Sequence, residues 1–150
     1  MRSKVVSKNL DTVLAILKNE VDGNVSCALE KMASDYSMTW MYRGKDLLFP
    51  TSRPNVKENL EEIYPIRGRK YRIKNTAEGE NVVMVELIES YSDPKTGQFH
   101  QTPLVLVLEM EDGKIKKGRH YCDPKLSYED LNEQQLQEGY RNTPDKFVIE

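Results

Sequence analysis

The chain has 150 residues, with 38% hydrophobic and 31% charged residues, a composition that favours one globular domain over a disordered chain or a repeat array. Its formal net charge of −2 gives no basic surface for nucleic acid, and no stretch reaches the roughly 20 apolar residues of a membrane span. Cys27 and Cys122 stand far apart and outside any metal-ligand spacing, which indicates free thiols and a reducing, cytoplasmic compartment.

Helices and one strand are predicted in the first part of the chain. Apolar residues at helical spacing from Val6 to Val21 predict a first helix, with Glu20 on its outer face. A shorter stripe over Val25–Ala33 predicts a second helix, and the strand-forming run Ser37–Tyr42 follows it. A third helix is expected to begin near Asn55 and to end at Pro65.

The next part of the chain is predicted to form strands. The cluster at 67–70 is interpreted as a solvated basic turn, and 77–81 as a hairpin loop. Between and beyond these loops, 71–74 alternates, whereas 82–89 and 104–108 are apolar on both faces. Because one face of an antiparallel sheet usually meets water, these two strands need cover on both faces. Helices would cover one face, and sheet curvature or a second subunit the other.

A long hairpin closes the predicted sheet. Asp112-Gly113 is a strong turn signal, and the return strand then alternates. Alternation places Tyr121 and Asp123 on the face of Ile115, and His120 on the opposite face. A polar helix from Ser127 to about Tyr140 is expected to pack on the outside, so residues 1–126 would form the main domain and 127–150 a C-terminal helix and tail.

This order of elements predicts an α+β fold, with one curved mixed or antiparallel sheet and three N-terminal-half helices on its concave face. The paired helices, the Asp35-x4-Trp40 segment and the closing residues 112–123 (DGKI…RxYxD) resemble the nuclear transport factor 2-like superfamily. The resemblance covers Val6 to Asp123 and is closest to the branch of SnoaL-like polyketide cyclases and ketosteroid isomerases. It implies a cone-shaped barrel with an interior pocket for a small, largely apolar molecule, and a homodimer formed through the outer sheet face.

The catalytic residues of that branch are matched only in part. Ketosteroid isomerases place a general-base Asp just after the first strand begins, where this chain has Met41, so their chemistry is not expected here. Limonene epoxide hydrolases place an Arg and an Asp on the middle strand and a second Asp on the last strand. The matching positions hold Leu87, Glu89 and Asp123, which keeps the carboxylates but lacks the Arg. The last-strand Asp of SnoaL-type cyclases is matched by Asp123.

Candidate site residues follow from these patterns. Glu89 is in phase with Val83 and Val85, so we expect it to face the cone together with Asp123; the open alternatives are a solvated Glu89 and an Asp123 that only caps its strand. No metal-ligand spacing, Gly-rich phosphate loop or nucleophile elbow is present, so neither a metal nor a cofactor is expected. The candidate catalytic residues are Asp123, Glu89, Tyr121 and His100, and the candidate ligand-binding residues are Trp40, Leu87, Thr102 and Leu104.

Two functions stay open on the sequence. The first is a cofactor-independent isomerase, cyclase, dehydratase or hydrolase that uses carboxylate acid/base catalysis on a small, largely apolar molecule. The alternative is a non-catalytic ligand-binding or dimeric assembly module built on the same cone.

Overall fold

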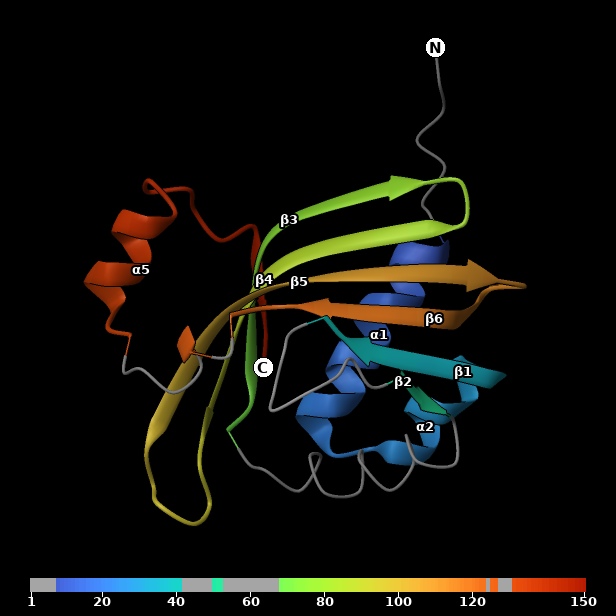
Figure 1. Cartoon of the computed structure of the whole chain (residues 1–150), viewed down its shortest axis with the longest axis horizontal. Coiled ribbons are helices and arrows are strands. Elements are labelled where there is room, and N and C mark those ends of the chain that lie inside the picture. The colour runs from blue at the N-terminus through green and yellow to red at the C-terminus, as the bar shows by residue number, and fades with distance from the viewer. Residues whose placement is uncertain (1–7, 42–49, 53–67, 124, 127–130) are drawn as a thin grey trace.

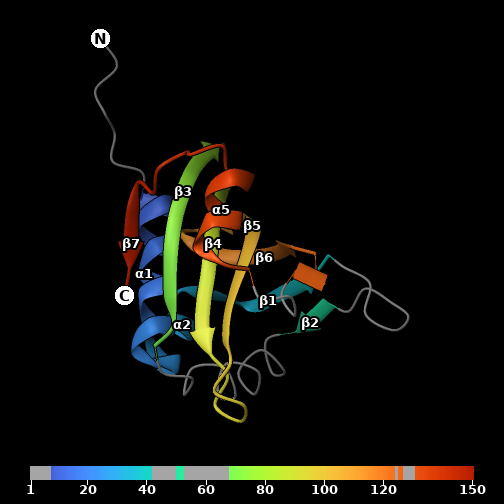
Figure 2. The ribbon, with the colours of Figure 1, turned by 90° about the vertical axis from the view of Figure 1, so that its left-hand side faces the viewer.

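The computed structural model describes residues 8–41, 50–52, 68–123, 125–126 and 131–150. One strongly curved sheet carries two N-terminal helices on its concave side and a C-terminal helix on its convex side (Figures 1 and 2). This arrangement confirms the predicted α+β class. The helix expected between Asn55 and Pro65 lies outside the described residues.

The two N-terminal helices pack in succession, as predicted. Helix α1 (Lys8–Asp22) buries Val13, Ile16 and Leu17, and α2 (Val25–Glu30) buries Ala28. The second helix is shorter than expected, because the backbone N–H of Lys31 turns back to the carbonyl groups of the last helical turn. Met32 and Ala33, which were predicted to be helical, instead begin strand β1.

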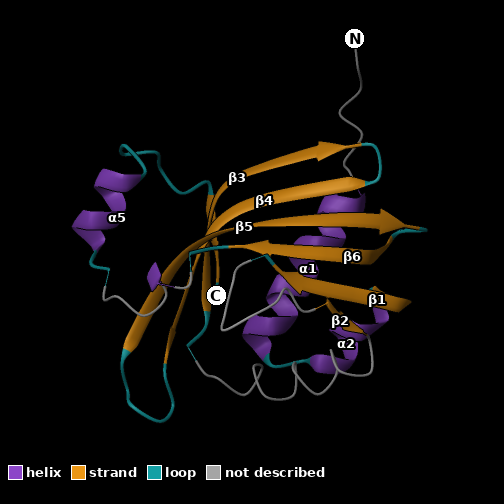
Figure 3. Cartoon of the chain, in the orientation of Figure 1, coloured by secondary structure: helices purple, strands orange, loops and turns teal. Residues whose placement is uncertain are grey.

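In the described part of the chain, seven strands form a single mixed sheet (Figure 3) in the order β2-β1-β6-β5-β4-β3-β7. Strand β1 runs parallel to β6, and all the other neighbouring strands are antiparallel. The three-residue strands β2 and β7 at the two edges were not predicted. The strands are β1 (Met32–Trp40), β2 (Pro50–Ser52), β3 (Lys70–Gly79), β4 (Val82–Ser92), β5 (Phe99–Glu111), β6 (Lys114–Tyr121) and β7 (Phe147–Ile149).

Tight turns join the central antiparallel strands. Asp112 (φ 52°) and Gly113 (φ 74°) both lie in the left-handed region, as the predicted Asp-Gly turn between β5 and β6 requires. The loop predicted over residues 77–81 is shorter than expected, because β3 continues to Gly79 and Asn81 (φ 56°) completes the turn. The long hairpin of β5 and β6 is therefore confirmed. A tight turn also joins β3 to β4, so β3 is longer than predicted.

A bulge in β6 reverses the alternation expected for that strand. Met110 pairs with Ile115, but Glu109 pairs with Lys117, so Lys116 is an extra residue that has no register partner on β5. Ile115 faces the core, and beyond the bulge Gly118 and His120 share that side. The predicted inward orientation of Tyr121 is therefore wrong, and its residue is 40% exposed.

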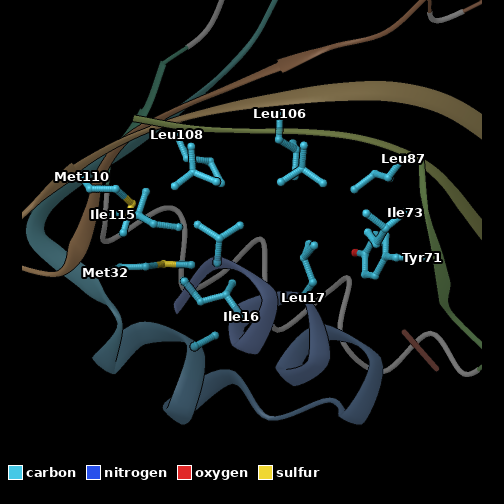
Figure 4. Close-up of a cluster of buried hydrophobic side chains, with 14 of the residues drawn as sticks. Ile16, Leu17, Met32, Tyr71, Ile73, Leu87, Leu106, Leu108, Met110 and Ile115 are labelled. Carbon is cyan, nitrogen blue, oxygen red and sulfur yellow. The ribbon is translucent and has the colours of Figure 1, made fainter. Parts of the chain in front are cut away.

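The core fills the space between the concave face of the sheet and α1 (Figure 4). Alternate residues of the paired strands β4 and β5 point inward, and Ile16 and Leu17 of α1 face them. Met32 and Ile115 close the core at the β1–β6 side. The inward apolar residues of β4 and β5 are Val83, Val85, Leu87, Leu104, Leu106, Leu108 and Met110.

The C-terminal segment packs on the outer face of β3 and β4. Helix α5 (Glu133–Gly139) begins after Asn132, whose side chain forms a capping box with Gln135. It is anchored by Arg72 of β3, which binds Glu133, and it buries Leu136. The sequence placed the start of this helix at Ser127, and residues 127–130 lie outside the described part of the chain.

Lys74 fixes the segment that follows α5. Lys74 is the extra residue of a bulge in β3, because Ile73 pairs with Leu87 and Asn75 with Glu86. The side chain of Lys74 is only 2% exposed. Its ammonium group lies 2.8 Å from a carboxylate oxygen of Asp145 and donates to the Thr143 carbonyl group at 2.8 Å. The buried cation is thus paired on the outer face.

Candidate interior site

An ion pair lies on the concave side of the sheet, where the apolar core ends. Arg69, just before β3, donates from Nη1 to Oε2 of Glu89 on β4 at 2.8 Å. The side chains are 4% and 21% exposed, respectively. The predicted inward orientation of Glu89 is supported by its register, because it pairs with the buried Thr102 in continuous antiparallel pairing of β4 with β5. The middle strand has no arginine of its own, and the guanidinium group beside Glu89 comes from the residue just before β3.

A second buried carboxyl group lies beside this pair. Glu20 of α1 accepts a hydrogen bond from the hydroxyl group of Tyr71, two residues after Arg69. Burial raises the pKa of Glu20 to about 7, the hydrogen bond from Tyr71 acts against this rise, and the negative charge of Glu89 adds to it. The interior therefore holds two carboxyl groups in different settings, one beside a guanidinium group and one beside a phenol.

Aromatic rings extend the cluster toward the end of the sheet. The guanidinium carbon of Arg69 lies 5.0 Å from the ring centre of Tyr91, and this ring lies 5.5 Å from that of His100. His100 is buried, and its Nδ1 has no hydrogen-bond partner among the described residues. His120 of β6 faces the same interior: burial lowers its pKa, and the negative charge of Glu89 partly offsets that effect. The cluster therefore combines two carboxyl groups with two imidazoles.

The predicted ligand-binding residues lie on the same side of the sheet. Leu87 and Leu104 are register partners, and both are buried; Thr102 is also buried. Trp40 is half-buried at the end of β1, where it pairs with His120. By alternation along β1 it shares the face of Tyr36 and Met38. Leu87 and Leu104 are part of the packed apolar core, and Thr102 adds a buried hydroxyl group on the same face.

Two of the predicted catalytic residues are not part of this cluster. Tyr121 pairs with Val105 on the outer face, and Asp123 is exposed beyond the end of β6. The carboxylate of Asp123 accepts a hydrogen bond from the backbone N–H of Lys125 at 2.9 Å, which is a local turn contact. The expectation that Asp123 and Glu89 share the interior is wrong, because the bulge at Lys116 exchanges the inward and outward positions in the rest of β6.

Arg69 and Glu20 belong to this polar cluster, although the sequence interpretation placed neither of them there. Arg69 was placed in a solvated basic turn, and Glu20 on the outer face of its helix. Both had a positional signal. Arg69 is in phase with the buried Tyr71 and Ile73, and Glu20 follows the buried Ile16 by four positions. Their charge predicted exposure to solvent, whereas their spacing from buried residues predicted an inward orientation.

The described residues contain no cluster of three or more His, Cys, Asp or Glu side chains that could hold a metal ion. None of the helices in the described part is long and apolar enough to cross a membrane. The chemistry that the site itself offers is proton transfer and hydrogen bonding by carboxyl, phenol and imidazole groups.

A second feature lies on the opposite, convex face. A shallow hollow of about 490 Å³ opens over the outer sides of β4, β5 and β6. Its floor combines exposed apolar side chains with the Arg119–Glu109 ion pair, whose atoms are 2.6 Å apart. The residues that line it include Val82, Met84, Val107, Glu109, Lys117 and Arg119.

Solved structures share this fold. A protein assigned to the SnoaL-like polyketide cyclases from Jannaschia sp. is 15% identical, with a TM-score of 0.68, and the match covers 83% of this chain and 92% of that one. An NTF2-like protein of unknown function from Cytophaga hutchinsonii is 15% identical, with a TM-score of 0.62 and coverage of 86% and 100%. TerC, co-crystallised with polyporic acid, is 18% identical, with a TM-score of 0.65 and coverage of 79% and 94%.

No family model and no curated protein matches the sequence. The structural matches establish that the chain has the NTF2-like fold. The resemblance seen in the sequence is thereby confirmed at the level of the fold.

Proposed function

We propose that the interior of the sheet binds a small, largely apolar and uncharged molecule and catalyses a proton transfer on it without a cofactor. Glu89 would act as the general base and His100 as a second proton-transfer group. The observation that carries this proposal is the Arg69–Glu89 ion pair, held at 2.8 Å at the edge of the apolar core beside the Tyr91–His100 rings. A positioned carboxylate in such surroundings is suited to remove a proton from carbon or from water.

The charges of the cluster favour an uncharged ligand. Arg69 and Glu89 cancel each other, Glu20 with its pKa of about 7 is largely protonated below neutral pH, and burial lowers the pKa of His120 and so favours its neutral form. A ligand with a net charge would lose its hydration in this interior without finding an opposite charge that is not already paired. Co-crystallisation of the structural neighbour TerC with polyporic acid supports a ligand-binding role for this fold.

A screen of small hydrophobic carbonyl, lactone and epoxide compounds tests the function. Compounds that raise the melting temperature are incubated with the protein, and products are followed by NMR spectroscopy. For a compound that turns over, Glu89→Gln is expected to lower kcat by about 100-fold or more, since a positioned acid/base group typically contributes 10²–10⁴-fold.

Glu86→Gln provides the matched control for that variant. Glu86 lies on the same strand but on the outer face, where it accepts a hydrogen bond from Asn75. Its replacement should leave kcat within about twofold of the wild-type value. Equal losses in the two variants would contradict the role of Glu89. Binding of several compounds without turnover of any would instead favour the alternative, a non-catalytic binding module.

We further propose that the hollow on the convex face belongs to the interface of a homodimer. The face has exposed apolar side chains at its centre, with Met84 43% and Tyr121 40% exposed. Oppositely charged groups accompany them, including Glu109 and Arg119. A two-fold axis lets such a mixed surface pair with itself. Among the described residues, the C-terminal segment contacts the outer face at Arg72 of β3 and Gln101 of β5, away from the hollow.

Light scattering should therefore give a mass near twice the 17.4 kDa of one chain. Val107→Lys is expected to return the mass to that of a monomer, because it places an unpaired charge in the centre of the interface. Val148→Lys, at an exposed position of the edge strand β7, should leave the dimer intact. A wild-type monomer at micromolar concentration would disprove the dimer.

A further inference from the structure

The contact between Glu20 and Tyr71 lies inside the molecule and joins two elements. The hydroxyl group of Tyr71 is carried by β3, the carboxyl group of Glu20 by α1, and the Tyr71 residue is only 2% exposed. In Figure 4 the oxygen of Tyr71 points between the sheet and α1, toward the apolar interior. The pair therefore faces the same interior as the Arg69–Glu89 ion pair.

A phenol has a single proton, so its hydrogen bonds depend on its neighbour. An ionised carboxylate can only accept, so an ionised Glu20 accepts the single hydrogen bond that the Tyr71 hydroxyl group can donate. A protonated carboxyl group can donate to the oxygen of Tyr71, and the hydroxyl hydrogen of Tyr71 is then released for another acceptor. A buried donor without an acceptor is unfavourable, so a ligand oxygen at that position would be favoured.

Glu20 is the member of the pair that changes charge near neutral pH. The groups that act on it are Tyr36 of β1, Tyr71 of β3, Arg69 next to Tyr71, and Glu89 of β4. Burial and the charge of Glu20 raise the pKa of both tyrosines, which stay protonated. Arg69 stays charged, because the surrounding negative groups, led by Glu89, outweigh the effect of its burial. Burial raises the pKa of Glu20 itself to about 7.

We propose that the Glu20–Tyr71 pair makes the interior site select ligands with an oxygen that accepts a hydrogen bond, such as a ketone, lactone or epoxide, and that it does so only while Glu20 is protonated. This inference rests on the proposed interior binding site and adds the ligand class and a pH-dependent control of its binding. Tyr71 is the residue that contacts the ligand, and Glu20 acts through Tyr71 as a positioning residue.

Two probes of similar shape test the proposal. 2-Acetylnaphthalene carries a carbonyl oxygen, and 2-ethylnaphthalene replaces that group by a hydrocarbon. For the wild-type protein, the ketone is expected to bind about five- to tenfold more tightly at pH 5.5 than at pH 8.5, the effect of one net hydrogen bond. The hydrocarbon should bind equally at both pH values, since it makes no hydrogen bond. Fluorescence titration measures both dissociation constants.

Two isosteric variants separate the roles of the pair. In Glu20→Gln the affinity for the ketone should no longer depend on pH, because the side chain cannot ionise. In Tyr71→Phe the preference for the ketone over the hydrocarbon should disappear at both pH values. A pH dependence of ketone binding that persists in Glu20→Gln, or one that the hydrocarbon shares, would overturn the inference.

A measurement on the wild-type chain needs no variant. Carboxyl-resolved NMR titration should show that saturation with the ketone raises the pKa of Glu20 further, because proton and ketone favour each other's binding reciprocally. Saturation with the hydrocarbon should leave that pKa as it is in the free protein. An equal effect of the two probes would contradict the inference alone. If neither probe binds, the interior binding site itself is disproved, and the selectivity with it.

Discussion

Replacement of Lys74 by methionine is expected to lower the free energy of unfolding by about 3 kcal/mol, a cost typical of breaking a buried ion pair. Methionine keeps most of the length of the side chain and removes the ammonium group. Asp145 then loses a partner at 2.8 Å, and the carbonyl group of Thr143 loses its donor. The ring of Tyr140, 4.8 Å from the ammonium nitrogen, also loses a favourable contact with the cation.

Chemical denaturation measures this change, and Lys70→Met on the same strand is the control. The side chain of Lys70 is 42% exposed and lies 3.7 Å from an exposed carboxylate of Glu150. Its replacement should change the stability by no more than about 0.5 kcal/mol. If the two variants lose the same amount, then the burial of Lys74 does not hold the C-terminal segment on the sheet.

The second large effect concerns the pH dependence of stability. The pKa of Glu20 rises from 4.5 to about 7 on folding, with burial as the main cause. Between these values the folded protein holds a proton that the unfolded chain has released. The contribution of Glu20 to stability is therefore complete below pH 4.5, falls as the pH rises to about 7, and stays low above it, by on the order of 3 kcal/mol in total.

Glu20→Gln should remove this slope, and the free energy of unfolding of wild type relative to the variant should fall between pH 4.5 and 7. Urea denaturation at a series of pH values measures the difference, in which the titration of all other groups cancels. Glu30→Gln, at the exposed end of α2, serves as the matched control and should follow the wild-type curve. A difference that is constant with pH would rule out a buried, protonated Glu20.

The inward residues of β4 and β5 could be predicted from alternation alone. Their pairing runs from Val82 with Glu109 to Ser92 with Phe99 without a shift, so Glu89, Thr102 and His100 follow the apolar residues into the interior. The same rule failed on β6, because one extra residue at Lys116 exchanges the two faces. A bulge leaves no clear mark in a run of polar residues, so the end of that strand could not be oriented from the sequence.

The buried charged residues of the candidate site could not be predicted from residue type. Charged residues are usually exposed, and Arg69 and Glu20 were interpreted accordingly. Their burial depends on partners that arrive from distant parts of the chain: Glu89 for Arg69, and Tyr71 for Glu20. The same holds for Lys74, whose counter-charge Asp145 lies far along the chain on the C-terminal segment. Such pairs are visible only once the sheet has brought the strands together.

The parallel pairing of β1 with β6 also determines the order in which the molecule can assemble. Met32 pairs with Ile115, so β1 can pair only after the distant strand β6 has formed. The β5–β6 hairpin, closed by Asp112 and Gly113, needs no such long loop and can form locally. We expect the hairpin to be the first structure that the chain retains, with β1 and its helices docking later, and folding to take milliseconds to seconds, as for other domains rich in non-local strand pairs.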